Sequence, residues 1–272
     1  MSSPSTPLRT GFSWPRAKAV FQKDFLDLTK NKALLWSMLA LPAILVVAPT
    51  LVVFAYVHKP DDPNLRVMAQ YYDATVNAAD AARFLVGKVL IDWFAVYLIM
   101  PVFVPILISS HAVAGEKERR TLEPLLASPV TPLELLIGKS LASLVPSFAI
   151  CVIAFVGLCC AVDVVAWDVV KGPLLPSRMW MFGVFVIAPL FAFFGNGVSV
   201  VISARVGDAR LAQQLSGLFV LPLVGLAGGQ FAGWLKAGVA YYAALGAFVL
   251  LLDVLLVVAA RRLFDRERMM SR

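Results

Sequence analysis

The sequence predicts an all-α polytopic membrane protein with six transmembrane helices. Of its 272 residues, 60% are hydrophobic and 15% are charged, whereas ordinary soluble domains carry about 25% charged residues. The mean hydropathy of +0.82 agrees, and it excludes a cytosolic enzyme, a disordered regulator and a secreted disulfide scaffold. The apolar stretches approach or exceed the roughly 20 residues of a spanning helix and lack the alternation of barrel strands. We therefore expect one transmembrane domain, 1–272, built from helical spans.

Six apolar stretches are long enough to cross a bilayer. The first begins after a polar segment and is too long for a signal-peptide core, so we expect it to remain as the first helix. Typical spans need about 20 residues. The six predicted spans are 33–57, 89–112, 141–167, 179–204, 215–235 and 239–260.

The distribution of Lys and Arg predicts the sidedness of these spans. Of 24 such residues, 17 lie in the N-terminal segment, the second and fourth connections and the C-terminal segment. Because cytoplasmic segments carry the excess of cations, both termini are expected in the cytoplasm. The net charge of +7 is thus a topology signal, and it indicates no nucleic-acid partner. Aromatic side chains that prefer the interface lie near the predicted outer ends: Tyr56, Trp93, Trp167, Trp180, Trp234 and Tyr241.

Two segments outside the spans are expected to be helical. An amphipathic helix is predicted at 12–32, because Ala17, Phe21, Phe25 and Leu28 recur at helical spacing, apart from a charged face of Arg16, Lys23, Asp27 and Lys30. We interpret it as an interfacial helix whose cations face membrane lipid phosphates, and a solvated juxtamembrane helix is the alternative. In the first outer loop, an Ala-rich stretch over 73–85 is expected to form a helix that leads into the second span.

The inner connection 115–139 has the pattern helix, break, helix. The run Thr131-Pro132-Leu133-Glu134 has the form of a capping box with proline at the first helical position, so the third helix is expected to start there. Before it, a short helix would present Leu122, Leu125 and Leu126 on the cytoplasmic face. These apolar side chains need a surface to pack on, which predicts a protein partner at the membrane.

One feature of this connection resembles a phosphate-binding loop but lacks the full pattern. Gly138-Lys139-Ser140 matches the end of that motif, which requires a second glycine at the position that Leu133 occupies. The tripeptide also falls inside the predicted third helix, where backbone N–H groups are not free to bind phosphate. We expect no nucleotide site in this chain, so any ATP chemistry must come from another polypeptide.

The stretch from Glu116 to Val130, followed by Glu134 and Gly138-Lys139, resembles the signature connection of the ABC-2 type permeases, the membrane subunits of bacterial ABC exporters. The predicted topology resembles that family over the whole chain. One departure is Arg120, where many members carry glycine. The resemblance implies that this loop houses a coupling helix that docks on an ATPase subunit, with roles for Glu116, Glu118, Arg119, Thr121, Leu122, Glu123, Leu126, Pro129, Gly138 and Lys139.

The resemblance also implies the assembly and the location. It implies two permease chains, as a homodimer or with a paralogue, and two ABC ATPase subunits that hold ATP and Mg, with no cofactor in this chain. The location would be the bacterial cytoplasmic (inner) membrane, and the direction of transport outward. The substrate is left open among lipid-like compounds, drugs, peptides and ions. A secondary transporter or channel without an ATPase, an intramembrane enzyme, and an assembly or anchoring protein are the alternatives.

Polar residues within the spans are the remaining candidates for chemistry. Asp253 could serve as a cation or proton site, or it could make a polar contact to another helix or to water. Asp92 lies near an outer end, where interfacial hydration would explain it. Asn196, between Gly195 and Gly197, and the fifth-span glycines Gly225, Gly228 and Gly229 allow either close helix packing or a local break that binds substrate.

Metal and catalytic patterns are missing from the sequence. Three cysteines fall in the third span and the two histidines are far apart, so neither a disulfide framework nor a metal site is expected. No nucleophile elbow is present, and no catalytic residue is assigned. Helix kinks are expected at Pro101, Pro105, Pro146, Pro189 and Pro222.

Overall fold

The computed structural model describes residues 12–59, 62–77, 80–118 and 130–270. Within these ranges all regular secondary structure is helical, with no β-strand. The described residues contain six helical stretches long and apolar enough to cross a membrane, which confirms the predicted fold class at that level. They are Lys32–His58, Ala81–Ala112, Leu133–Val170, Arg178–Arg205, Ala209–Phe231 and Val239–Val258.

Several spans consist of more than one helical segment. A short helix α1 (Trp14–Lys30) precedes the first span, and α3 (Pro63–Tyr72) lies between the first and the second. The first three spans are α2 (Lys32–His58), α4 with α5 (Ala81–Tyr97 and Ile99–Glu118) and α7 (Pro132–Val170). The fourth is α8 (Arg178–Phe182), the π-helical η2 (Gly183–Ile187) and α9 (Ala188–Arg205). The fifth is α10 (Ala209–Gly217), the 3₁₀ turn η3 (Leu218–Val220) and α11 (Leu221–Phe231), and the sixth is α12 (Val239–Met270).

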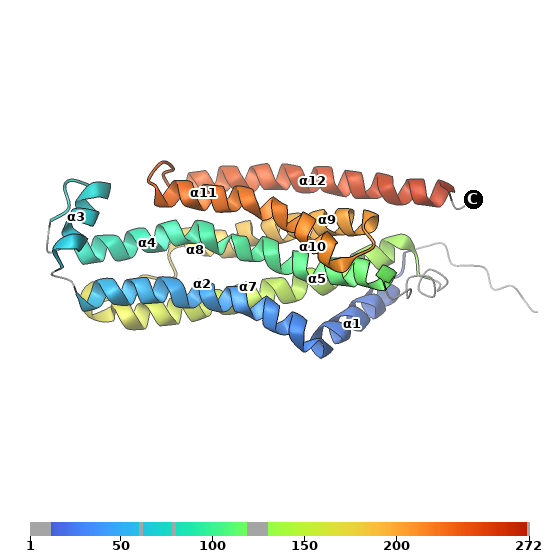
Figure 1. Cartoon of the computed structure of the whole chain (residues 1–272), viewed down its shortest axis with the longest axis horizontal. Coiled ribbons are helices and arrows are strands. Elements are labelled where there is room, and N and C mark those ends of the chain that lie inside the picture. The colour runs from blue at the N-terminus through green and yellow to red at the C-terminus, as the bar shows by residue number, and fades with distance from the viewer. Residues whose placement is uncertain (1–11, 60–61, 78–79, 119–129, 271–272) are drawn as a thin grey trace, which may run out of the picture.

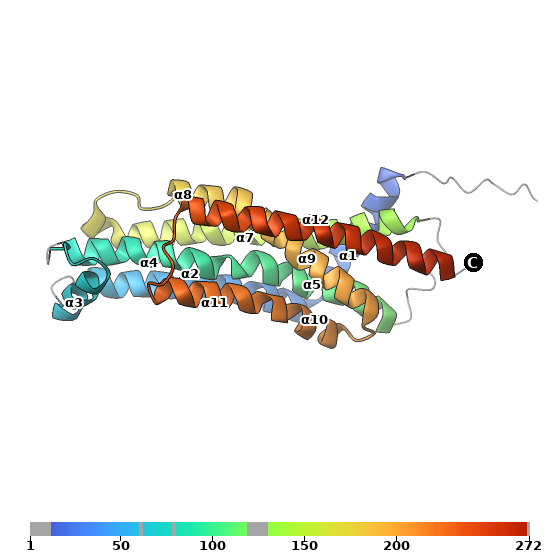
Figure 2. The same cartoon turned by 90° about the horizontal axis from the view of Figure 1, so that it is seen from above.

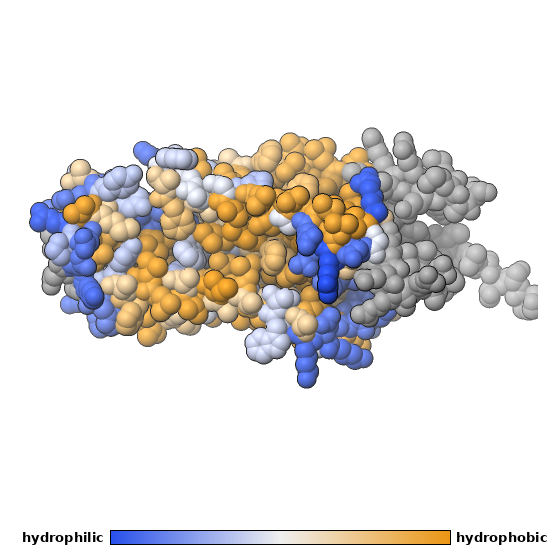
Figure 3. Space-filling model, viewed as in Figure 1, coloured by the Kyte–Doolittle hydropathy of each residue, from blue (hydrophilic) through white to orange (hydrophobic). Residues whose placement is uncertain are grey.

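The helices form an elongated bundle with different structures at its two ends. Helix α1, the C-terminal end of α5, the N-terminal end of α7 and the C-terminal end of α12 lie at one end, and α3 lies at the other (Figures 1 and 2). We call these the α1 end and the α3 end. Between them the visible surface is largely apolar, with hydrophilic residues gathered toward both ends (Figure 3). This distribution is the one that a bilayer requires of a spanning bundle.

The outer connection differs from its prediction. The helix that we expected over 73–85 is wrong for 73–77, which form a turn, whereas Ala81–Leu85 is helical and leads into the second span as predicted. Asp62 caps α3 by accepting the Asn64 N–H at 2.9 Å, with Pro63 at the first helical position. Asp73 accepts hydrogen bonds from the backbone N–H and the hydroxyl of Thr75, which holds the chain in a turn. Local side-chain bonds therefore outweigh the helix propensity of the alanines.

Three span boundaries also shift. The second span begins at Ala81 and its helix continues to Glu118, whereas the prediction was 89–112. The third helix begins at Pro132, ahead of the predicted span 141–167, because the capping box at Thr131 is present as expected. The fifth span is Ala209–Phe231 in place of 215–235, because Gly233 adopts φ +76° and turns the chain toward α12.

Prolines mark most of the irregularities inside the spans. The break between α4 and α5 at Leu98 precedes Pro101, the π-helical η2 precedes Pro189, and the 3₁₀ turn η3 precedes Pro222. Proline lacks a backbone N–H and crowds the preceding turn, which explains these departures from α-helical geometry. Pro105 and Pro146 lie inside helices that continue past them.

The second span is the centre of the bundle. Of its most apolar stretch, 72% is buried inside the protein, against 17% of the corresponding stretch of the sixth span. Phe94 and Tyr97 on α4 pack on Trp180, whose indole N–H donates to the Leu90 carbonyl at 3.2 Å. Trp180 is only 1% exposed, so its ring packs inside the protein at the beginning of the fourth span and not on the outer surface of the bundle. An aromatic cluster that satisfies the indole N–H inside the protein competes successfully with the membrane interface.

Candidate functional site

Helix α1 packs closely against the beginning of α7 at a glycine. A β-carbon at Gly138 would lie 2.7 Å from the Ala17 carbonyl oxygen and 2.7 Å from the Val20 β-carbon. Such distances are far below van der Waals contact, so only glycine allows the two helix backbones to approach this closely. Gly138, one of the predicted coupling residues, thus joins α7 to the helix that precedes the first span.

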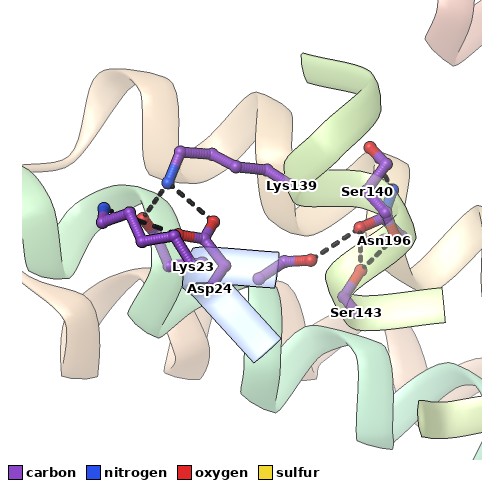
Figure 4. Close-up of polar contacts among 8 residues, drawn as sticks. Lys23, Asp24, Lys139, Ser140, Ser143 and Asn196 are labelled. Atoms are coloured by element: carbon purple, nitrogen blue, oxygen red, sulfur yellow. Dashed lines mark hydrogen bonds and ion pairs between the residues drawn. The ribbon is translucent and has the colours of Figure 1, made fainter. Parts of the chain in front are cut away.

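The adjacent residue, Lys139, joins three helices. Its ammonium group lies 3.1 Å from the Asp24 carboxylate on α1 and donates to the Ala112 carbonyl on α5 at 2.9 Å (Figure 4). The Lys139 and Asp24 side chains are 6% and 7% exposed, respectively. We call Asp24, Ala112 and Lys139 the three-helix clamp. Ala112 precedes the inner connection and Lys139 closes it, so the clamp ties both ends of that connection to α1.

Glu134 makes a second joint between the same helices. Its carboxylate accepts the Ser13 N–H at 2.5 Å, and it lies 3.4 Å from the Arg16 guanidinium. The same side chain, which is fully buried, accepts the Thr131 N–H at 2.8 Å as part of the capping box. Glu134 therefore caps α7 and anchors the start of α1 with one carboxylate. Charge-assisted hydrogen bonds of this kind are stronger than bonds between neutral groups.

Next to the clamp, Asn196 on α9 connects three spans. Its carbonyl oxygen accepts the hydroxyls of Ser109 and Ser143, each at 2.6 Å, and its amide donates to the Ser140 hydroxyl at 3.0 Å (Figure 4). These serines belong to α5 and α7, so the second, third and fourth spans share one buried polar cluster. Small polar residues commonly join transmembrane helices in this way. The arrangement favours packing over a broken substrate-binding helix at Asn196.

The neighbouring glycines serve the same packing. A β-carbon at Gly195 would lie 2.3 Å from the Val102 carbonyl oxygen of α5, and one at Gly197 would lie 3.2 Å from Leu256 of α12. The helix through Gly195, Asn196 and Gly197 is continuous. Close approach, rather than a local break, is therefore what these residues provide.

The other predicted coupling residues divide into two groups. Glu116 and Glu118 lie in the last turns of α5, at the α1 end. Arg119, Thr121, Leu122, Glu123, Leu126 and Pro129 fall in 119–129, outside the described residues. Gly138-Lys139-Ser140 lies inside α7, as the predicted start of the third helix at Thr131 implies.

Sequence reasoning missed Asp24. The predicted apolar face of α1 contained Phe21 and Phe25, but the buried residues are Ala17, Val20 and Leu28, and Phe25 is 36% exposed. Asp24 follows Val20 by one turn and precedes Leu28 by another, so it lies within the buried stripe. A carboxylate inside an apolar stripe is the signal that could have found it, because such a group requires a buried partner.

Asp92 is not hydrated as we expected. The residue is 3% exposed and forms an ion pair with Lys88 one turn earlier on α4. The Lys88 ammonium also lies 4.5 Å from the centre of the Tyr72 ring, and the Tyr72 hydroxyl donates to the Phe231 carbonyl at 3.3 Å. The pair therefore helps to fasten α3 to the α3 end of the bundle. Because burial excludes water, a neighbouring cation takes the place of hydration.

Asp253 lies within α12, and both carboxylate oxygens are buried without a hydrogen-bond partner among the described residues. Gly246, two turns earlier, contacts Ile187, and Leu256 contacts Gly197, so this stripe of α12 faces the fourth span. Asp253 belongs to the sixth span, whereas the three-helix clamp joins α1, α5 and α7. Its role as a substrate, cation or proton site stays a prediction.

Metal ligands are not clustered in the described part of the chain: no three His, Cys, Asp or Glu side chains there could hold one ion. The remaining features are a six-span helical bundle, polar joints between its spans and a short helix tied to one inner connection. Together they define a multi-pass helical membrane protein.

A family model described as "ABC-2 family transporter protein" matches residues 18–252, and the chain belongs to this family. The match confirms the resemblance drawn from the connection 115–139, and it identifies the chain as a transport permease of the ABC-2 family. No curated protein and no solved structure matches the chain.

Proposed function

We propose that this chain is the permease subunit of an ATP-driven exporter in the bacterial cytoplasmic membrane. Two permease chains, identical or paralogous, would form the pathway between them, and two ATPase subunits would bind and hydrolyse ATP with Mg. The chain itself would hold no cofactor and catalyse no reaction. The observation that carries this proposal is the three-helix clamp, which ties both ends of the connection 115–139 to α1.

The proposed orientation places the α1 end in the cytoplasm. The excess of Lys and Arg in the corresponding segments supports it, since cytoplasmic segments carry more cations. Helix α1 would then lie at the inner interface. Its exposed Trp14, Phe25 and Leu26 support this position, because lipid would cover apolar side chains that the protein leaves open.

The clamp supports a route for force from the ATPase to the spans. A push on the connection would act on α5 and α7 at once, and α1 would move with them because Lys139 and Glu134 hold it. The Asn196 cluster would pass the movement to α9. Shifting a two-state pathway from 1:99 to 99:1 takes about 5.5 kcal/mol, so ATP binding must favour one state by that amount.

The proposed docking is tested by the double substitution Glu123→Arg with Leu126→Asp. One change reverses a charge and the other places a carboxylate on the apolar docking face, so we expect at least tenfold less ATPase to co-purify, equivalent to about 1.4 kcal/mol. Membrane insertion should be unchanged. The measurement is the ATPase-to-permease ratio after affinity purification in mild detergent.

The matched control places similar changes at the α3 end. Val67, which is 67% exposed, becomes Asp and the exposed Asp73 becomes Arg. This control should keep the ATPase. Equal retention of the ATPase by both variants would contradict docking at 115–139. A wild-type chain that purifies without any ATPase would favour a secondary transporter.

A further inference from the structure

The junction of α1 and the first span carries two exposed lysines and an exposed tryptophan. Lys30 ends α1, Lys32 begins α2, and Asn31 between them caps α2 by accepting the Leu34 N–H at 3.1 Å. Both lysines are exposed, and Trp36, one turn further along α2, is 74% exposed. In Figure 3 hydrophilic residues protrude at the lower edge of the bundle, where Figure 1 shows that α1 meets α2. We call Lys30, Lys32 and Trp36 the basic elbow.

The charged face that the sequence predicted on α1 has two different roles. Arg16 and Lys23 lie 3.4 Å and 3.5 Å from the carboxylates that anchor α1, so they face groups of the joints with α7. Lys30 and Lys32 instead form no ion pair with any residue that the structure describes. The exposed carboxylate of α1, Asp27, offsets one charge at most. The described part of the protein therefore leaves positive charge at the elbow for a partner to neutralise.

Trp36 and Lys32 indicate that this junction lies at the membrane surface. They are four residues apart on α2, so they share a helix face, and Trp36 lies about 6 Å deeper into the span. Tryptophan prefers the interfacial layer, and lysine side chains extend from it toward the lipid phosphates. Trp14 and Leu26 on α1 are 57% and 54% exposed, and lipid would cover them in the same layer. These positions favour a lipid head group as the partner of the elbow.

We propose that the basic elbow binds the phosphate group of an anionic phospholipid, such as phosphatidylglycerol. Lys30 and Lys32 are two residues apart, so their Cα atoms are at most about 7 Å from each other and both ammonium groups can reach one phosphate. A zwitterionic lipid is a weaker ligand, because its own cationic group competes with the lysines for the phosphate. Charge complementarity thus selects anionic lipid over zwitterionic lipid.

The bound lipid would also stabilise the three-helix clamp. Helix α1 packs on α7 at Gly138 and is held there through Asp24 and Lys139. A lipid that fixes the last residue of α1 in the head-group layer favours the arrangement in which these contacts are made, since a ligand stabilises the state that it binds. The inference goes beyond the proposed function, because it requires a bilayer and depends on neither the ATPase nor the substrate.

The test compares the full chain in nanodiscs of phosphatidylcholine with the same chain in nanodiscs that also contain phosphatidylglycerol. Two quantities are measured: the temperature of unfolding, and the phosphatidylglycerol that native mass spectrometry finds on the released protein. We expect phosphatidylglycerol to raise the unfolding temperature of the wild type. Lys30→Gln with Lys32→Gln should abolish this rise and retain at least tenfold less phosphatidylglycerol, since each lysine contributes about fivefold, the equivalent of about 1 kcal/mol.

Two controls separate the elbow from general effects of charge. Lys59→Gln with Arg66→Gln removes two exposed cations at the α3 end, and this variant should behave like the wild type in both measurements. In phosphatidylcholine alone the elbow variant should unfold at the wild-type temperature, because exposed side chains contribute little to the stability of the fold.

Three results would overturn the inference. Equal retention of phosphatidylglycerol by the two double variants would mean that the protein carries only unspecific boundary lipid. Equal retention of both lipids by the wild type would exclude selection by charge. Loss of the ATPase or of the permease dimer from the elbow variant, with unchanged lipid retention, would make the elbow a protein-docking surface. The ATPase-to-permease ratio is measured on the same purified samples, so a retained ATPase without lipid selectivity refutes the elbow and leaves the proposed function standing.

Discussion

Replacing Gly138 with leucine is expected to separate α1 from α7 and to reduce ATPase association about tenfold or more. Even a β-carbon at this position would meet the Ala17 carbonyl oxygen and the Val20 side chain at 2.7 Å. The contact involves backbone on one side, so it cannot be relieved by a rotamer change alone. Overpacking of this kind typically costs about 1–3 kcal/mol. The helices must therefore move apart, and the joints at Asp24 and Glu134 would stretch with them.

This result is measured in two ways on purified protein. Tryptic cleavage within α1 should become faster, and the ATPase-to-permease ratio should fall. Gly157→Leu is the matched control on the same helix, because a β-carbon there meets nothing within 4 Å. If Gly138→Leu behaves like Gly157→Leu in both measurements, the close contact with α1 has no part in coupling.

Replacing Lys139 with methionine is expected to have the second large effect. The change leaves the Asp24 carboxylate buried and without its closer cation, while Lys23 lies 3.5 Å from it with a half-exposed side chain. Removing one partner of a buried ion pair costs about 3–5 kcal/mol, and Lys23 should hold the cost near the lower limit. Thermal unfolding in lipid nanodiscs should therefore begin at a clearly lower temperature. The permease should also no longer change the rate at which its partner ATPase hydrolyses ATP.

The double variant Lys139→Met with Asp24→Leu separates charge from packing. Once the unpaired carboxylate is removed as well, most of the lost stability should return, because contacting residues are not additive. Lys18→Met, an exposed cation on the same helix α1, should change neither measurement. A double variant no more stable than Lys139→Met would mean that the ion pair does not account for the loss.

Much of the architecture was predictable because it follows from local patterns. The count of candidate spans depends on apolar length alone, and the start of α7 depends on four consecutive residues at Thr131–Glu134. The bounds of the outer helix and of the second and fifth spans were less accurate. There, hydrogen bonds from Asp62 and Asp73 and the positive φ of Gly233 set the helix ends.

The joints of the candidate site were harder to predict because their partners are distant in the sequence. Lys139 was identified through the family resemblance, but its partner Asp24 lies 115 residues away, and its position depends on how α1 packs. Asn196 was noted as a polar residue between glycines, yet Ser109, Ser140 and Ser143 become its partners only after three spans assemble. Composition and helical spacing cannot choose among the many serines of an apolar bundle.

The central claim is that this chain works as the membrane subunit of an ATP-driven transporter. The most direct measurement is affinity purification of the tagged full chain from its own membranes in mild detergent, followed by identification of bound subunits and an ATP hydrolysis assay. We expect a nucleotide-hydrolysing subunit at one copy per permease chain, with ATP hydrolysis in the purified complex. A chain that purifies without any such subunit, in detergent that preserves its folded state, would contradict an ATP-driven permease.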